Sequence, residues 1–102
     1  MTRGTTPTNT FYTSVSLVGA TVYVTYEQNG VICAEKTNED MTITDDAVSV
    51  RLSQEDTLRF QSACEPVHIQ IRYIRQDGQA DASNIMKTTV KRILKEGTIE
   101  YV

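Results

Sequence analysis

Paired carboxylates are the first residues of this 102-residue chain that could do chemistry, either as general acids and bases or as cation ligands. Asp45 and Asp46 are adjacent, so on a strand their side chains would point to opposite faces, and the pair instead predicts a turn. Asp77 and Asp81 flank an expected hairpin tip where calcium could bind, but the dense Asp, Asn and Gly ligands of a dedicated calcium loop are missing. We therefore predict no metal site, no cofactor and no catalytic carboxylate pair.

Residues that could serve as a nucleophile or a base are few. His68 is the only histidine, which is too little for a zinc site or a Cys/His pair, and its strand parity predicts a surface position. Cys33 and Cys64 lie on different expected elements and form no CxxC motif, so they are either two free thiols, as a reducing compartment favours, or one disulfide. We expect no enzymatic activity; a small enzyme would need a site built around these three residues.

Basic and aromatic side chains suggest contact with another protein. Basic residues follow the two arms of an expected hairpin and could form one cationic stripe, which suits an acidic partner but also describes an ordinary solvated face. Tyr23 has the strand parity opposite to Val22 and Val24, which makes it either a subunit contact or a cover for the sheet edge. The candidate interface residues are Tyr23, Arg72, Arg75, Lys87, Lys91 and Arg92.

Composition and charge narrow the classes of partner. A net charge of −3 argues against broad binding to the phosphate backbone of nucleic acids. No apolar run approaches the length of a membrane span, and the N-terminus lacks the pattern of a secretory signal, so we expect synthesis in a reducing cytoplasm. The length predicts a single domain with a modest core.

Short strands must position these residues, because apolar and polar side chains alternate along most of the chain. Residues 1–9 contain almost nothing apolar and are expected to form a flexible N-terminal arm, either a disordered end or a segment that orders on a neighbouring subunit. The remaining residues, 10–102, are expected to form one domain. The expected strands cover residues 10–17, 20–28, 31–37, 41–44, 47–52, 67–73, 81–94 and 98–102.

Local signals define the turns and the helix. Ser53 followed by Glu55 and Asp56 predicts the start of a helix of about two turns. The dipeptides Asn29-Gly30 and Asp77-Gly78 predict hairpin turns, and the loss of alternation after residue 89 predicts a bulge near residues 91–92. Together these signals predict an all-β protein, an immunoglobulin-like antiparallel β-sandwich with one short helix.

Three stretches, residues 17–26 (LVGATVYVTY), 50–58 (VRLSQEDTL) and 67–86, follow one another as strand, capped turn and hairpin. In this order they resemble small structural proteins of tailed bacteriophages of Gram-positive hosts, specifically the N-terminal domain of phage baseplate upper proteins. The chain differs from the multi-domain baseplate proteins, which continue into a stem and receptor-binding parts. The resemblance covers most of residues 10–100 and implies no catalytic residue.

The resemblance implies a non-enzymatic structural or adaptor subunit of a bacteriophage or prophage virion, made in the bacterial cytoplasm. Its partners would be other virion proteins and further copies of itself, without nucleic acid, membrane or small-molecule ligand. The alternative is an immunoglobulin-like module that binds carbohydrate or protein for surface attachment. Exposed tyrosines favour this alternative, and the absence of Trp argues against it because sugar platforms favour large aromatic side chains.

Overall fold

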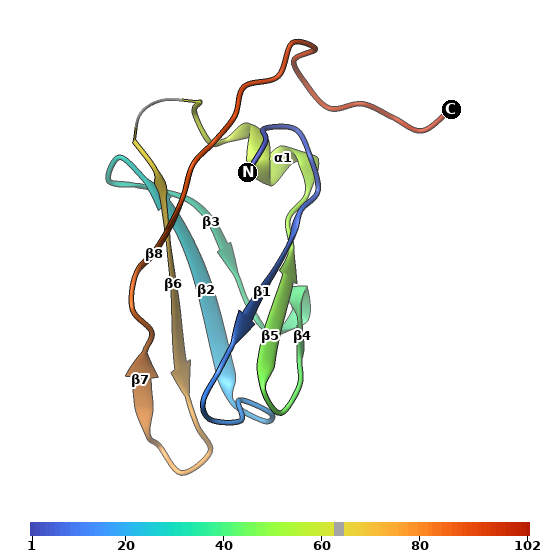
Figure 1. Cartoon of the computed structure of the whole chain (residues 1–102). Coiled ribbons are helices and arrows are strands. Elements are labelled where there is room, and N and C mark those ends of the chain that lie inside the picture. The colour runs from blue at the N-terminus through green and yellow to red at the C-terminus, as the bar shows by residue number, and fades with distance from the viewer. Residues whose placement is uncertain (63–64) are drawn as a thin grey trace.

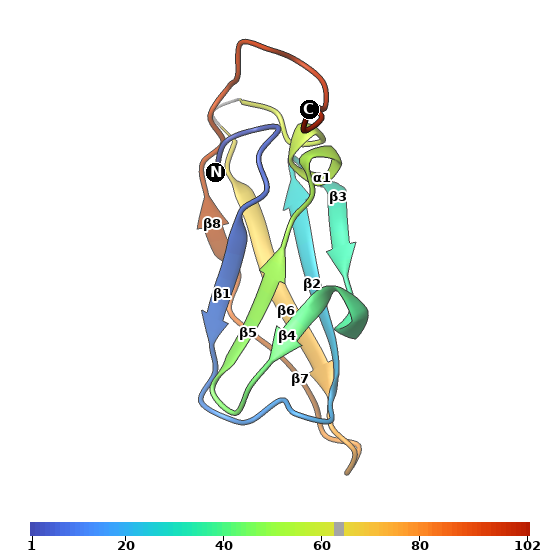
Figure 2. The ribbon, with the colours of Figure 1, turned by 90° about the vertical axis from the view of Figure 1, so that its right-hand side faces the viewer.

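A computed structural model describes residues 1–62 and 65–102 and contains two antiparallel sheets that face each other (Figures 1 and 2). The smaller sheet has the order β1 (Thr8–Tyr12), β5 (Ala47–Arg51), β4 (Met41–Ile43). The larger sheet has the order β3 (Val31–Lys36), β2 (Thr21–Gln28), β6 (Val67–Ile74), β7 (Ala80–Ala82), and β8 (Met86–Thr88) also pairs with β6. The helix α1 (Gln54–Leu58) and the 3-10 turn η1 (Asn38–Asp40) complete the fold. The predicted β-sandwich with one short helix is confirmed.

The core lies between the sheets and explains the alternation in the sequence. Every second residue of β2, β5 and β6 points inward and is almost inaccessible to solvent, as at Val22, Val24, Tyr26, Val48, Val50, Val67, Ile69 and Ile71. Leu17, Leu52 and Phe60 are equally buried at the ends of the sandwich. Each such side chain stabilises the fold by about 1.5–3 kcal/mol through its removal from water.

The two predicted hairpin turns are confirmed by backbone geometry. Asn29 and Gly30 both have positive φ, 54° and 80°, as a two-residue turn between β2 and β3 requires. Gly78 has φ 87° at the tip between β6 and β7, where the Gly78 N–H donates to the Arg75 carbonyl at 2.9 Å. Glycine adopts this left-handed conformation without a steric penalty.

The second arm of the long hairpin is not the continuous strand that the sequence predicted. It is divided into β7 and β8, and the register advances by one residue between the pairs Arg72–Ala82 and Ile69–Met86. Ser83 holds the irregular part to β6, because its hydroxyl accepts the Ile71 N–H at 3.0 Å and its own N–H donates to the Ile71 carbonyl. The register shift thus lies near residues 83–85, and the bulge predicted near residues 91–92 is misplaced.

The start of α1 is a reciprocal cap, as predicted, although the helix is only five residues long. The Ser53 hydroxyl accepts the Asp56 N–H at 3.0 Å, and the Asp56 carboxylate accepts the Ser53 N–H at 2.9 Å. The same carboxylate lies 2.7 Å from the Lys36 Nζ of β3, and Asp56 is only 5% exposed. Burial raises the pKa of Asp56, but hydrogen bonds from Lys36 and Ser53 outweigh burial, so the pKa lies below its ordinary value.

One buried side chain of β2 binds both Gln61 and Glu65, which lie between α1 and β6. Gln28 is 5% exposed, and its amide nitrogen donates to the carbonyls of Gln61 and Glu65 at 2.7 and 3.0 Å. Its amide oxygen accepts the Gln61 N–H at 2.7 Å. Burial of this polar side chain is therefore fully compensated by hydrogen bonds to backbone.

The N-terminal segment, expected to form a flexible arm, lies against α1 and the chain after β8 (Figure 1). Thr2 forms a parallel bridge with Lys91, and the Lys91 N–H donates to the Met1 carbonyl at 2.7 Å. The Arg3 guanidinium donates to the Phe60 and Leu58 carbonyls at 2.7 and 3.1 Å. These carbonyls at the end of α1 lack partners within the helix, so a cation there satisfies them and gives the segment a defined position. Strand β1 also begins inside the expected arm and ends at Tyr12.

The strand predicted over residues 98–102 is wrong. This segment has no regular structure, and Tyr101 and Val102 are fully exposed. Its described attachment is the Gln54 side-chain amide, which donates to the Ile99 carbonyl at 3.0 Å and accepts the Ile99 N–H at 2.8 Å. A strand needs a neighbouring strand edge, and here one glutamine side chain takes that place.

The Asp56–Lys36 contact gives the first prediction. Asp56→Ala should lower the free energy of unfolding by about 2–4 kcal/mol, because it removes a helix cap and leaves the Lys36 ammonium without its partner. Urea denaturation followed by circular dichroism measures the effect. Glu55→Ala changes the adjacent exposed acid and serves as the matched control, with an expected change of about 0.5 kcal/mol or less. Equal losses in both variants would contradict the assigned role of Asp56.

The lowered pKa of Asp56 also predicts a pH dependence. The stability that the charged carboxylate contributes is present above the pKa of an unfolded Asp, about 4, and is lost as the pH falls through the lower pKa of the folded state. Wild-type protein should therefore lose more stability between pH 5 and pH 2 than Asp56→Asn does. Thermal denaturation at several pH values checks this expectation, and parallel pH profiles of the two proteins would refute it.

Candidate interaction surfaces

The outer face of the larger sheet brings together two of the predicted interface residues. Tyr23 of β2 and Arg72 of β6 are direct cross-strand partners, and both side chains point away from the core. Tyr23 is 42% exposed although its neighbours Val22 and Val24 are buried. A shallow hollow of about 510 Å³ surrounds the pair and is lined by Tyr23, Thr25, Glu35, Arg72, Tyr73, Ile74 and Ala80.

The other four predicted interface residues lie farther from this pair, so the five basic residues among the six do not form one stripe. Lys87 pairs with His68 on the same outer face, but His68 is four residues from Arg72, about 13 Å along the strand. Arg75 lies beyond the end of β6 and lines a separate hollow with Gly19 and Gln76. Lys91 and Arg92 are exposed in the segment after β8, beside the N-terminus.

The surroundings of His68 and Cys33, the described residues that could act as base or nucleophile, are defined by the structure. The Nδ1 atom of His68 lies 3.4 Å from a carboxylate oxygen of Glu27, whose other oxygen accepts the Gly30 N–H at 2.7 Å and so holds the β2–β3 turn. Burial raises the pKa of the Cys33 thiol, which disfavours the reactive thiolate. Cys64 lies outside the described residues, so the predicted alternatives of two free thiols or a Cys33–Cys64 disulfide both stay predictions.

A groove that the sequence analysis missed opens between the sheets, on the side where β1 faces β7 and β8. We call it the edge groove; it encloses about 370 Å³ and is lined by Phe11, Tyr12, Thr13, Ser14, Val15, Leu17, Ile71, Tyr73, Asp81, Ala82, Ser83, Asn84 and Met86. Tyr12 is 82% exposed at its rim. The sequence carries no local signal for the groove, because its walls come from residues 11–17 and 71–86, which are far apart in the chain.

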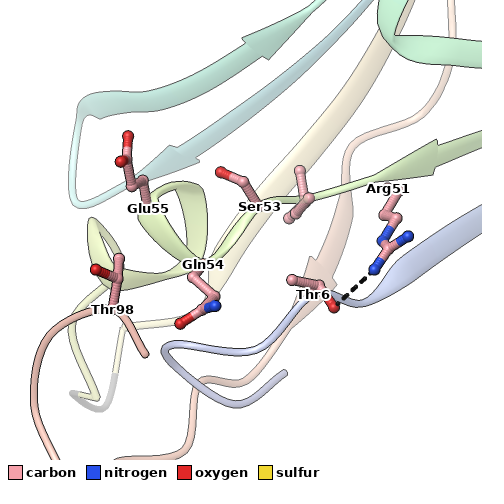
Figure 3. A pocket seen from close by; sticks show the side chains of 7 residues that line it. Thr6, Arg51, Ser53, Gln54, Glu55 and Thr98 are labelled. Carbon is pink, nitrogen blue, oxygen red and sulfur yellow. Dashed lines mark hydrogen bonds between the residues drawn. The ribbon is translucent and has the colours of Figure 1, made fainter. Parts of the chain in front are cut away.

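A further hollow of about 600 Å³ lies at the α1 end of the molecule (Figure 3). Six of its seven lining residues have polar side chains. Figure 3 shows Arg51 directed toward Thr6, whose hydroxyl is 3.4 Å away, while Glu55 stands apart. Ser53 contributes to the wall, but its hydroxyl already accepts the Asp56 N–H in the helix cap. Ser53 therefore acts in the helix cap.

Comparison of the chain with models of protein families, with curated proteins and with solved structures found no match. Among residues 1–62 and 65–102 there is no group of three His, Cys, Asp or Glu side chains that could hold a metal ion. No helix in this part of the chain is long and apolar enough to cross a membrane.

The exposure of the Tyr23–Arg72 pair predicts that it contributes little to folding. Tyr23→Ala and Arg72→Ala should each lower the free energy of unfolding by about 1 kcal/mol or less, the range of a cross-strand pair on an exposed face. Ile69→Ala, which removes an inward-facing side chain of the same strand as Arg72, should cost about 2–5 kcal/mol. Chemical denaturation of the three variants compares them; losses of similar size would show that the outer face is needed for folding.

Proposed function

We propose that this protein is a non-enzymatic structural or adaptor subunit of a bacteriophage or prophage virion, in the tail, the baseplate or a related assembly. The observation that carries the proposal is the outer face of the larger sheet, where Tyr23 lies beside Arg72 and close to Ile74, which is 47% exposed. Tyr and Arg are among the residues most enriched at the centres of protein interfaces. This face supports a function that works through protein–protein contacts.

The virion is proposed from the sequence. Residues 17–26, 50–58 and 67–86 resemble the N-terminal domain of phage baseplate upper proteins, and they supply β2, α1 and the long hairpin. The Tyr23–Arg72 pair joins the first and third of these stretches. The part of the chain that carries the resemblance is thus also the part that carries the proposed contact surface.

The finer topology that we propose is immunoglobulin-like. The orders β1-β5-β4 and β3-β2-β6-β8 correspond to strands B-E-D and C′-C-F-G of an immunoglobulin-type sandwich. The parallel bridge between Thr2 and Lys91 supports this assignment, because it sets the N-terminal segment beside the chain that follows β8. Sandwiches of this kind have two outer faces that are available for contacts with neighbouring subunits.

The alternative function is a carbohydrate- or protein-binding module for surface attachment. It is favoured by Tyr12, whose exposed ring stands at the rim of the edge groove near Asp81 and Asn84. Aromatic faces beside carboxylate and amide groups suit sugar rings and their hydroxyls. A glycan array probed with the wild type and with Tyr12→Ala tests it: binding that the substitution abolishes would support this function.

The virion proposal is tested on particles of the phage or prophage that encodes the chain. Mass spectrometry of purified virions should detect the polypeptide in several copies per particle. Tyr23→Ala/Arg72→Ala should reduce its incorporation about tenfold or more, because interface residues of this type cost about 2 kcal/mol or more when truncated. Thr42→Ala, an exposed change on the opposite sheet, should leave incorporation unchanged. Particles that lack the polypeptide would refute the proposal.

A further inference from the structure

The segment 98–102 has the pattern of a strand but no strand beside it. Ile99 and Tyr101 would share one face of an extended chain, with Glu100 between them on the other face. Ile99 is 60% exposed and Tyr101 fully exposed, and Figure 1 shows the segment running away from the sandwich. Apart from the two hydrogen bonds between Ile99 and Gln54, the described structure gives its backbone no partner. Such a segment is a candidate for adding a strand to another sheet.

The edge groove offers a place for an added strand. On one side it is flanked by β1, which pairs only with β5 among the described strands, and on the other side by β7 and β8 at the end of the larger sheet. Its floor is apolar and includes Phe11, Leu17 and Ile71. The β1 backbone can still hydrogen-bond to a further strand on this side, whereas on the β7 side the Ala82 N–H already donates to the Asp81 carboxylate at 2.8 Å.

The protein already closes the other end of this seam with an added segment. Met1 packs against the core there, and Thr2 and Lys91 form a parallel bridge. The N-terminal segment therefore covers the seam between the sheets at the α1 end. In the described structure, no segment covers the edge groove at the opposite end in the same way. A short extended segment with an apolar side chain is the kind of occupant that fits.

The segment 98–102 cannot occupy the groove of its own chain while Ile99 is bound to Gln54. Gln54 starts α1, close to the Thr8 end of β1, whereas Tyr12 lies at the far end of that strand (Figure 2). Tyr12 is thus about 13 Å further along β1, and Tyr101 is only two residues from Ile99, a reach of about 7 Å. The groove of a second copy is subject to no such limit.

We propose that residues 98–102 of one copy insert as a strand into the edge groove of a second copy. Ile99 and Tyr101 enter the apolar floor, and Glu100 faces outward. Lys87 of β8, which is exposed next to the groove-lining Met86, provides the opposite charge. The segment and the groove are different surfaces, so the contact runs head to tail and generates a ring or a filament. This inference deepens the proposed function, on which it rests, by naming a second copy of the chain as a partner.

The experiment uses two full-length variants changed only at exposed or rim positions, so that both should fold. The tail variant, Ile99→Asp/Tyr101→Asp, keeps the groove, and the groove variant, Tyr12→Asp/Lys87→Glu, keeps the tail. In size-exclusion chromatography with light scattering, the wild type should form oligomers and each variant alone should be a monomer. An equimolar mixture should form a complex of two chains and no larger species, because one functional tail meets one functional groove.

Ile32→Asp is the matched control, since it places the same charge at an exposed apolar residue of the opposite edge strand, β3, and should leave the oligomers intact. Circular dichroism confirms that each variant folds, and fluorescence anisotropy of a labelled peptide of residues 94–102 should show binding to the tail variant but not to the groove variant. A wild type that stays monomeric, or oligomers that survive the tail substitutions, would overturn the inference. If virions contain the chain but the purified chain is monomeric, the inference fails and the proposed function stands. If the chain forms oligomers but is absent from virions, only the proposed function is refuted.

Discussion

The ion pair between Asp56 and Lys36 is the contact on which the rest of the architecture depends, because it joins the two sheets at one end of the sandwich. Lys36 ends β3 of the larger sheet, and Asp56 lies in the helix that directly follows β5 of the smaller sheet. The carboxylate also closes the cap with Ser53, so one buried anion fixes both the direction of the helix and its distance from β3. An unpaired carboxylate at this depth would be costly, and the lysine and the cap together make it favourable.

The same anion shapes its surroundings. The Tyr26 ring is fully buried and packs against Phe60, with the ring centroids 6.1 Å apart, while its hydroxyl accepts a hydrogen bond from the Asn9 side chain at 2.9 Å. Burial raises the pKa of Tyr26 to about 12; the hydrogen bond from Asn9 lowers it, and the charge of Asp56 raises it further. The interior thus holds one paired charge and keeps the nearby phenol neutral. Toward the opposite end of the sandwich, the edge groove leaves the seam between the sheets open.

The sequence predicted the features that depend on local physics and missed those that depend on distant segments. Alternation predicted β2 and β6, the glycine dipeptides predicted both hairpin turns, and parity set Tyr23 on the face opposite to Val22 and Val24. The pairing of Tyr23 with Arg72 depends on the strand register, which the sequence did not predict. The position of the N-terminal segment could not be predicted, because Arg3 binds the carbonyls of Leu58 and Phe60, more than 50 residues away. The basic residues do not form the predicted stripe, for a similar reason. Their expected stripe required one uninterrupted second arm, and the bonds of Ser83 to Ile71 interrupt it.

Gln28 has a consequence for how the chain can vary. Its buried amide binds only backbone atoms of Gln61 and Glu65, so nothing in these contacts depends on which side chains stand at either position. Over evolution, the side chains at positions 61 and 65 can therefore change without loss of these hydrogen bonds. Gln28 itself has no such freedom, because only a side-chain amide at this depth supplies both a donor and an acceptor to the same stretch of backbone. Related chains should thus be recognisable by an invariant glutamine facing a variable connection.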